Sequence, residues 1–474
     1  MSNMHWYWNR LKLMSLGEIV FRIKEFARKQ LEKNRLLLLQ DVPAWRPPSN
    51  PDSWILFWFE REAFSNNRQR ADNILEGQLP IFANPNVRLG HPPDWNRDTQ
   101  TDLLAPLIFG KSLNYRDNKL VGDIKYLWEP NRHQHLVILA QAYHSTGDDK
   151  YLKGAQIQIQ SWIEQCPYPL GPNWSSSLEL AIRLINWSIL WQLIGGSDPT
   201  LLQEKIGKKF FDDWLKSIYK HCYFIKGNLA SFSSANNHLI GEVAGLFIAA
   251  QTWPYWDKMD KWGEQAKGIL EQECLKQNAP DGVNREQTTA YQQFVLDFLL
   301  LSALAGKANG VRFSKDYWAR IEAMLECLAS FMDVGGHMPM IGDADDGYVV
   351  RLSQERDFNP YRSLLATGAV LFKRSDFKSK AGRFDHKSMW LLGEEGKREF
   401  DELGNEPVNL TVRRHFPEGG YYILGKDFET QKEIKGLVDS GPLGYLSIAA
   451  HGHADALSFV LSIGGKEFLI DPCT

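Results

Sequence analysis

The hydrophobic and polar positions divide the chain into two parts with different periods. From about residue 130 to 335, apolar residues recur with the spacing of amphipathic helices, in consecutive segments of about 12 to 18 residues. Clusters of Gly, Pro, Asn and Asp separate the segments, as expected where helices end. The pattern predicts a stack of helical hairpins, although no motif repeats at a fixed period.

Two segments show the helical face most clearly. One face consists of Leu152, Ala155, Ile159, Trp162 and Ile163. The face of the next segment consists of Leu178, Ala181, Ile182, Ile185 and Ile189. Further helices are predicted to centre near residues 210, 245, 265, 297 and 325.

After Gly335 and Gly336 the pattern changes to short alternating runs, which are typical of strands. We expect a β domain that begins near residue 365 and includes runs at 420–425, 446–450 and 458–470. The last run contains Gly464 and Gly465, which predict a two-residue hairpin turn with Ile463 facing Lys466. Because only a few strands precede the last residue, we expect an incomplete sheet and a truncated sequence.

The N-terminal part, residues 1 to about 110, combines a basic amphipathic helix at 15–33 with Pro-rich irregular stretches. Such a helix would suit a membrane surface, but Glu18, Glu25 and Glu32 interleave its positive charges. We therefore expect a surface helix packed on the main body. The predicted organisation is an extension at 1–110, a helical domain at 111–360 and the start of a β domain at 361–474.

Composition excludes several classes of function. The 474 residues carry a net charge of -3 with no basic block, which argues against a nucleic-acid partner. No stretch reaches 18 uninterrupted apolar residues, so we expect no membrane span. The first residues do not form a signal peptide, which predicts a cytoplasmic protein with the periplasm as the alternative. The five cysteines are widely spaced and predict neither a disulfide framework nor a zinc finger.

The C-terminal run His451-Gly-His453-Ala-Asp455 carries chemistry of two kinds. Neutral imidazole serves both as a metal ligand and as a proton-transfer group near pH 7. The predicted hairpin register places Asp471 opposite Ser458, so a pair of His453 and Asp471 is feasible. The alternative, a polar loop beside a hairpin, has equal weight.

Three polar clusters interrupt the helical region. Asn236, Asn237 and His238 precede an apolar helix, where they would cap its N-terminus and favour an anion; His238 and Glu242 share one face of it. Taken alone, this cluster is equally compatible with, and more simply explained by, an ordinary cap and a surface pair. Glu286 and Tyr291 lead into another helix, where the phenol is either core or a proton-transfer group. Glu179 and Arg183 are four residues apart in an apolar helix and form either a salt bridge or part of a cleft.

A run of aspartates, Asp343, Asp345 and Asp346, is similar to the start of a calcium-binding loop. Such a loop ends with a bidentate Glu at its twelfth position. Counted from Asp343, that position is Gln354. The sequence therefore does not support a calcium site here.

Taken together, these motifs resemble the heparinase II/III-like polysaccharide lyases, a superfamily that includes alginate lyases. The matching stretches occur in the family's order over residues 120 to 474, and the combined set is more specific than any one motif. The stretches are Trp174–Arg183, Asn236–His238, Glu286 with Tyr291, Pro339–Asp343, His451–Asp455 and Asp471-Pro472.

The resemblance implies an incomplete (α/α) toroid followed by an antiparallel β-sandwich, with the active site in the cleft between them. It also implies β-elimination from uronate-containing polysaccharides. In that chemistry the substrate carboxylate is neutralised, a base removes the C5 proton and an acid protonates the departing O4.

The resemblance also assigns roles to individual residues. Asn237, helped by His238, would bind the substrate carboxylate. Tyr291 would transfer protons, and His451 would be a second proton-transfer or charge-neutralising group. The expected substrate-binding residues are Glu179, Arg183, Asn236, Glu242 and Glu286.

A structural zinc site is a further implication of the resemblance, with His453 and Asp471 as ligands. The third ligand, a downstream histidine in the family, has no counterpart in this chain. Cys473 also stands where the family commonly has Gly.

The predicted function is thus a lyase acting on an acidic, uronate-containing polysaccharide. One alternative is a non-catalytic glycan-binding or exopolysaccharide-assembly protein with the same fold. A second is an (α/α) glycoside hydrolase, which needs two carboxylic acids facing one bond, and no such pair stands out in the sequence.

Overall fold

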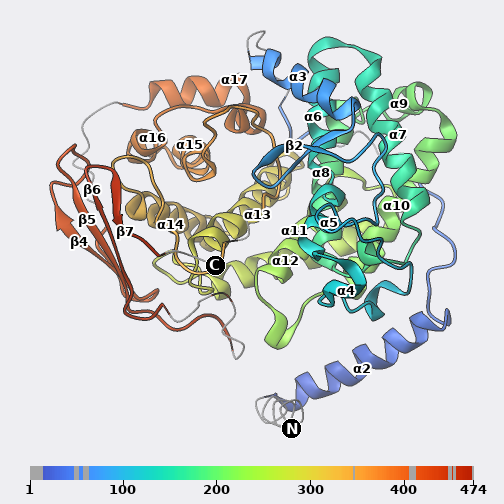
Figure 1. Ribbon diagram of the computed structural model, residues 1–474, viewed down its shortest axis with the longest axis horizontal. Coiled ribbons are helices and arrows are strands. Elements are labelled where there is room, and N and C mark those ends of the chain that lie inside the picture. Colours follow the sequence, from blue (N-terminus) through green and yellow to red (C-terminus); the bar gives the residue numbers. More distant parts are fainter. Residues whose placement is uncertain are drawn as a thin grey trace.

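The computed structural model describes residues 14–46, 53–56, 63–344, 347–404, 413–446, 451 and 455–471, with residues 63–66 described by backbone alone. In this part of the chain no helix is long and apolar enough to cross a bilayer. Figure 1 shows a large helical region and, at its far end, a single sheet built from the C-terminal strands.

The described part of the N-terminal region contains helix α2 (Leu16–Lys33), close to the predicted bounds of 15–33, with Ser15 as its N-cap. The Ser15 hydroxyl accepts a hydrogen bond from the Glu18 backbone N–H at 3.2 Å. Helix α3 (Ala63–Leu75) and the antiparallel hairpin of β1 (Gln78–Ile81) and β2 (Asn84–Arg88) follow. Helix α3 packs on α6 (Gln134–Thr146) of the main helical region.

The main helical region follows the predicted apolar periodicity. Its remaining helices are α4 (Asn118–Val121), α5 (Ile124–Asn131), α7 (Asp149–Gln165), α8 (Ser177–Leu193), α9 (Pro199–Ile206), α10 (Lys208–Gly227), α11 (Asn237–Thr252), α12 (Asp257–Gln277), α13 (Thr289–Ala308) and α14 (Lys315–Phe331). Short 3-10 turns lie at Gly110–Ser112, Pro172–Trp174 and Phe232–Ser234.

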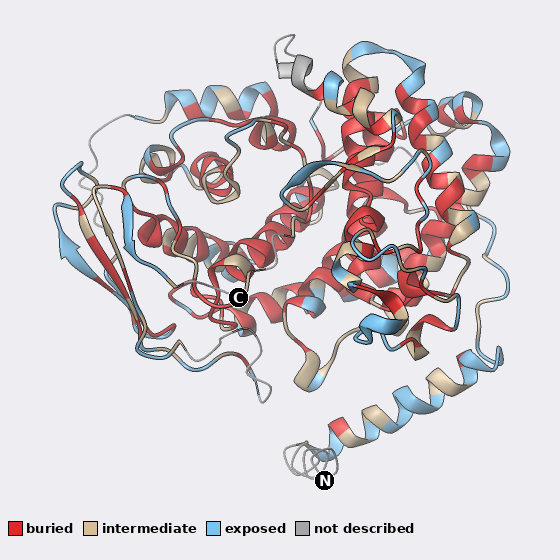
Figure 2. Ribbon diagram, viewed as in Figure 1, coloured by how far each residue is buried: buried red, intermediate tan, exposed pale blue. Residues whose placement is uncertain are grey.

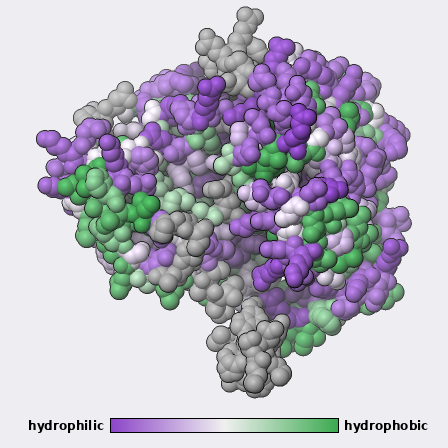
Figure 3. Space-filling model, viewed as in Figure 1, coloured by the Kyte–Doolittle hydropathy of each residue, from purple (hydrophilic) through white to green (hydrophobic). Residues whose placement is uncertain are grey.

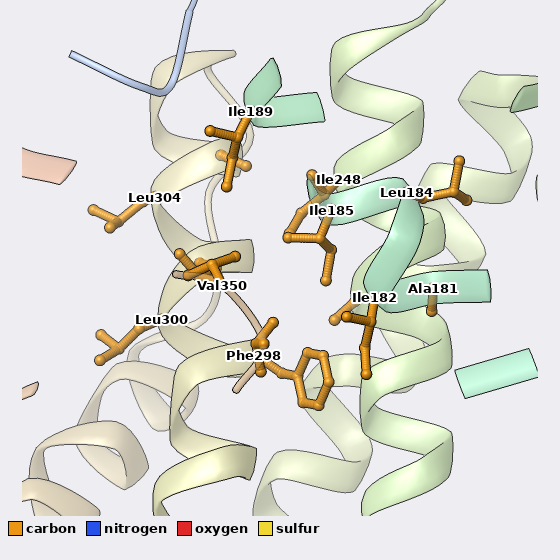
Figure 4. Close-up of a cluster of buried hydrophobic side chains, with 14 of the residues drawn as sticks. Ala181, Ile182, Leu184, Ile185, Ile189, Ile248, Phe298, Leu300, Leu304 and Val350 are labelled. Carbon is orange, nitrogen blue, oxygen red and sulfur yellow. The ribbon is translucent and has the colours of Figure 1, made fainter. Parts of the chain in front are cut away.

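Helices α8, α11 and α13 form the centre of this region and are buried on almost every side (Figure 2). Side chains of α8, such as Ile185, meet Ile248 of α11 and Phe298 of α13 in one hydrophobic core (Figure 4). Gly245 lets α11 approach α8 closely, because a Cβ at this position would lie 2.6 Å from Ala181 Cα. The toroid core is thus built from helices that the sequence pattern predicts.

The change from helices to strands comes later than the predicted residue 361. Three more helices, α15 (Pro360–Phe372), α16 (Ser375–Ala381) and α17 (His386–Glu402), continue the helical region. The strands that follow are β3 (His415–Phe416), β4 (Tyr421–Lys426), β5 (Ile434–Asp439), β6 (Phe459–Ile463) and β7 (Lys466–Leu469). They pair antiparallel in chain order.

The terminal hairpin has the predicted turn, with Ile463 opposite Lys466. An irregularity in the ladder then shifts the register by one residue, so Leu461 faces Leu469. Strand β7 ends at Leu469. After the one-residue shift, Asp471 is no longer in the register position opposite Ser458 that the sequence predicted. The expected strand at 446–450 lies largely outside the described residues.

The sheet is attached to the helices at the end of α14. The Lys435 ammonium on β5 donates a hydrogen bond of 2.6 Å to the Met332 carbonyl oxygen, and Lys380 of α16 donates to the same oxygen at 2.8 Å. The Phe331 ring contacts the rings of Phe416 and Tyr421 at 5.3 and 5.2 Å. These buried contacts hold the sheet against the helical region.

Candidate active site

A cleft of about 780 Å³ lies between the helical region and the segment around His451. Its walls come from α2, from the segment leading into α8, from the N-termini of α11 and α13, and from residues 340–344 and 347–348. Six of the site residues expected from the sequence line it. They are Glu179, Asn237, His238, Glu242, Tyr291 and His451.

Asn237 is held at the first turn of α11 by a buried carboxylate. Glu286 is 1% exposed and accepts two hydrogen bonds from Asn237, from the backbone N–H at 2.9 Å and from Nδ2 at 2.8 Å. The Nδ2 group has two N–H donors, and Glu286 takes one of them. The buried Oδ1 of Asn237 has no hydrogen-bond partner among the described residues. Glu286 therefore fixes which way the Asn237 amide points.

Burial raises the pKa of Glu286. The neighbouring His451 and the hydrogen bonds from Asn237 act in the opposite direction and favour the carboxylate. The carboxyl group itself does not line the cleft but lies behind Asn237. Asn236 also lies behind the lining, where its side chain caps α11 by accepting from the His238 N–H at 3.2 Å.

Tyr291 and His451 lie in direct contact in the cleft. Their ring centroids are 4.3 Å apart. Tyr291 is in the first turn of α13, which Thr288 caps, and the Thr288 hydroxyl also donates to the Asp343 carbonyl oxygen at 2.8 Å. The phenol is therefore placed by the helix cap and the imidazole by a loop from the other end of the chain.

His451 forms a pair with Asp343. The Nδ1 atom lies 2.8 Å from Asp343 Oδ2, and the Asp343 backbone N–H donates to the His451 carbonyl oxygen at 3.1 Å. A carboxylate at Nδ1 favours the proton on that nitrogen, which leaves Nε2 as the proton acceptor. Nε2 lies 3.7 Å from Glu286 Oε2. The geometry gives His451 an oriented ring, as a proton-transfer group requires.

Basic side chains also line the cleft. They are Arg22, Lys111, Arg116, Lys125 and Arg132. Arg132 binds Glu179 through two hydrogen bonds of 2.8 and 2.9 Å and also contacts Glu129 at 3.0 Å. The pattern analysis missed Arg132 because it follows the short helix α5 and belongs to no motif. Several cations around one cleft favour an acidic ligand.

Arg183 does not reach the cleft, although the sequence analysis placed it there with Glu179. It is fully buried, with Nε donating to the Asn131 carbonyl oxygen at 2.6 Å and its guanidinium 4.3 Å from the Trp162 ring. Burial lowers the pKa of Arg183 to about 10. Arg183 lies one turn after Glu179 on α8. This helix is enclosed on all sides, and the Arg183 side chain points into the core. Glu179 pairs with Arg132 instead.

Glu242 and His238 lie one turn apart on α11, as their spacing predicts, but in different environments. His238 is exposed, whereas Glu242 is buried at 4% exposure and accepts a hydrogen bond of 2.6 Å from the Ala230 N–H. Burial raises the pKa of Glu242 to about 8, against the attraction of Lys111. This carboxyl group is therefore neutral more readily than an exposed one.

The zinc site expected from the sequence, with His453 and Asp471 as ligands, stays a prediction, because only one of the two ligands lies in the described part of the chain. His453 lies outside the described residues, as does Cys473. Asp471 lines a separate cavity of about 260 Å³ with Phe331, His337 and Leu469. Among the described residues, no three His, Cys, Asp or Glu side chains are placed to hold a metal ion.

Comparison with known protein families matches most of the chain. The model described as heparinase II/III N-terminus matches residues 94–365, and the model described as heparinase II/III-like, C-terminal, matches residues 409–472. Similar proteins include the heparin-sulfate lyase of Pedobacter heparinus, 23% identical over 77% of this chain and 50% of that protein. The heparin-sulfate lyase of Bacteroides thetaiotaomicron is 25% identical over 73% of this chain and 47% of that protein.

Solved structures confirm the predicted fold class, an incomplete (α/α) toroid followed by an antiparallel β domain. A heparinase III structure aligns with a TM-score of 0.60 at 16% identity, covering 96% of this chain and 64% of that chain. The heparan sulfate lyase HepC from Pedobacter heparinus aligns with a TM-score of 0.54 at 18% identity, covering 94% and 60%. This chain spans about half the length of the curated relatives it matches.

Proposed function

Since the chain belongs to the heparinase II/III family, we propose that it is a polysaccharide lyase that cleaves a uronate-containing glycan by β-elimination. One observation carries the proposal. Tyr291 and His451 are in ring contact in a cleft that Asn237 also lines. A phenol, an oriented imidazole and an amide are the groups that this elimination needs.

The reaction begins with the uronate carboxylate, whose negative charge opposes removal of the C5 proton. In our proposal, the second amide N–H of Asn237 binds this carboxylate and the exposed His238 assists. The cations of the cleft lower the energy of the charge that develops on the carboxylate as the C5–H bond breaks. The selective stabilisation of this charge is what makes the proton removable.

His451 then takes the C5 proton on Nε2, and the electron pair of the C5–H bond forms the C4–C5 double bond. The C4–O4 bond breaks, and Tyr291 protonates the departing O4. Tyr291 is reprotonated from His451 across their contact, which returns both groups to their starting states. Asp343 stabilises the imidazolium that exists in between, through its contact with Nδ1.

The substrate class follows from the cleft and from the relatives together. Arg132 is held on Glu179 and Glu129, so its guanidinium is fixed in the cleft wall. Lys111, Arg116 and Lys125 provide further positive charge, whereas Arg22 is paired with Glu18 and Glu25. Because the curated relatives are named heparin-sulfate lyases, heparan sulfate is the first polymer to test, with alginate as an unsulfated uronate polymer beside it.

The hydrolase alternative finds little support in the geometry. Glycoside hydrolysis uses two carboxyl groups facing one bond. In the cleft, Glu179 is bound to Arg132 on both oxygens, and Glu242 accepts the Ala230 N–H from its buried position. Of the other carboxyl groups described in the cleft, Asp343 is bound to His451 and Glu25 to Arg22, so none of these four has the arrangement of a hydrolytic pair.

Mass spectrometry of the products tests the proposal against both alternatives. Elimination produces a new non-reducing end that lacks one water molecule relative to the hydrolysis product. We expect heparan sulfate or another uronate polymer to yield the unsaturated end. Hydrated ends only would establish a hydrolase. If every uronate polymer tested stays intact but binds measurably, the protein is a glycan-binding protein.

A further inference from the structure

Helix α2 turns its charged side toward the protein. Arg22 donates to the Ser234 hydroxyl at 3.0 Å, and the Ser233 hydroxyl donates to Glu18 at 2.6 Å. The Phe21 ring contacts the Phe232 ring at 5.2 Å. These contacts fix the rotation of the helix about its own axis.

The three glutamates of α2 are all on this inward side. Glu18 and Glu25 pair with Arg22 at 3.4 and 3.3 Å, and Glu32 pairs with Arg28 at 2.8 Å. Glu18 and Glu32 are buried. The acidic residues that argued against a membrane role in the sequence are therefore neutralised by neighbouring arginines and directed away from the outer face.

The outer side of α2 is apolar and exposed. Leu16 is 84% exposed, Ile23 64% and Phe26 64%, and Val20 and Leu31 are exposed as well. Their spacing of three to five residues places them along one side of the helix. Figure 2 shows the exposure of this helix, and Figure 3 shows hydrophobic residues on the surface at the place that α2 has in Figure 1. The amphipathic helix thus has the reverse of the usual orientation, in which the apolar face meets the core.

Positive charge borders the apolar face. Lys24 and Lys33 are exposed on either side of it. Beyond the end of the helix, exposed Arg35, Leu36 and Leu37 continue this combination of positive charge and apolar side chains. The sequence ahead of α2, which lies outside the described residues, contains Trp6, Tyr7 and Trp8. These residue types favour the interface between lipid and water.

We propose that α2 binds the surface of an anionic membrane, with its apolar side between the lipid headgroups and its lysines against the phosphates. A helix with a large polar face on one side and an apolar face bordered by lysines has the properties of an interfacial helix. The bordering charge favours an anionic bilayer over a second copy of this chain, whose α2 would bring the same cations together.

Membrane binding would place the cleft beside the lipid surface. Phe21, Arg22 and Glu25, on the other side of α2, line the cleft. Binding of α2 to lipid does not depend on the proposed reaction.

Vesicle co-sedimentation of the full chain tests the inference. We expect binding to vesicles of phosphatidylcholine mixed with phosphatidylglycerol, weaker binding to phosphatidylcholine alone, and a decrease with added salt. The double variant Val20→Glu and Ile23→Glu should bind the mixed vesicles about tenfold or more weakly, because it removes two exposed apolar side chains that would be buried among the lipid headgroups.

A matched control places the same two charges on exposed aliphatic residues elsewhere, in Ile157→Glu with Leu201→Glu on α7 and α9. It should bind vesicles like the unmodified protein. Absence of binding to the mixed vesicles, or equal binding by the α2 variant, would overturn the inference. A dimer in sedimentation velocity that the α2 variant dissociates would also overturn it, since a second copy would then cover the face.

Discussion

At the scale of single residues, Glu286 positions groups of the candidate site although it does not line the cleft. Its two oxygens accept the backbone and side-chain N–H groups of Asn237, and its Oε2 lies 3.7 Å from His451 Nε2. The carboxylate thereby sets the direction of the amide and contacts the imidazole. We assign Glu286 to positioning, although the sequence analysis expected it to bind substrate.

The variant Glu286→Gln tests that role. Glutamine replaces one acceptor oxygen by a donor, so one N–H of Asn237 would lose its partner in a buried place. We expect a loss of about 1–3 kcal/mol in the free energy of unfolding and a lower kcat, because Asn237 is no longer held. Thermal unfolding and steady-state kinetics measure the two effects.

The exposed residue Glu394 provides the control for this change. Glu394→Gln should leave both the melting temperature and kcat unchanged. Full stability and full activity of Glu286→Gln would show that the carboxylate does not position Asn237.

Glu242 predicts a pH dependence of stability. Burial raises the pKa of this carboxyl group from the ordinary value of 4.5 to about 8. Between these values the folded protein binds the proton more tightly than the unfolded chain does, so stability falls as pH rises from about 4.5 to about 8. Glu242→Gln stays neutral and should show a smaller fall in melting temperature over this range. An identical pH profile in the variant would contradict the assignment.

The sequence predicted residues that line the cleft and also Glu286 behind them, but not the partner of Glu179. The motifs around Asn237, Tyr291 and His451 predicted one site, and the structure brings the three to one cleft. The pattern wrongly placed Arg183 in the cleft, because spacing along α8 does not tell which side of a fully buried helix meets a cavity. Only the packing of α5 beside α8 shows that Arg132 reaches Glu179.

At the scale of elements, the contact between α8 and α11 depends on a glycine. Gly245→Ala would place a Cβ 2.6 Å from both Cα and Cβ of Ala181, and backbone limits how far that neighbour can move. We expect a loss of about 1–3 kcal/mol from overpacking. Thermal unfolding measures this effect as a lower melting temperature.

Gly268 on α12 is the matched control, because it is exposed and a Cβ there meets no atom within 4 Å. Gly268→Ala should raise the melting temperature slightly, since alanine is the better helix former. Equal effects of the two substitutions would contradict the close contact between α8 and α11.

Two elements show where local patterns were insufficient. The apolar run Leu364–Phe372 lies in helix α15, yet a short, nearly continuous apolar segment is also compatible with a buried strand. The terminal hairpin has the predicted turn, but the bulge after Leu461 depends on pairing with the neighbouring strand. In both cases tertiary contacts decided between conformations that the sequence allows.

At the scale of the whole molecule, the candidate site joins segments that are distant in sequence. Asn237 and Tyr291 belong to the toroid, whereas His451 comes from the C-terminal part, and Asp343 contacts it from the loop after α14. The order of a helical domain followed by strands was predictable from the change of period. The orientation of α2 was not, because an amphipathic pattern does not tell which side of the helix faces the protein, and only contacts with Ser233 and Ser234 decide it.

The most direct test of the central claim is the ultraviolet absorbance of the C4–C5 double bond, followed for the unmodified protein and Tyr291→Phe on the same uronate polymer. Removal of the phenol hydroxyl should slow the rise in absorbance about 100- to 10,000-fold, the usual contribution of a general acid or base. The melting temperature and glycan binding should change little. An undiminished rise in the variant would contradict the proposed role of Tyr291, and no rise with the unmodified protein on any uronate polymer would contradict the lyase itself.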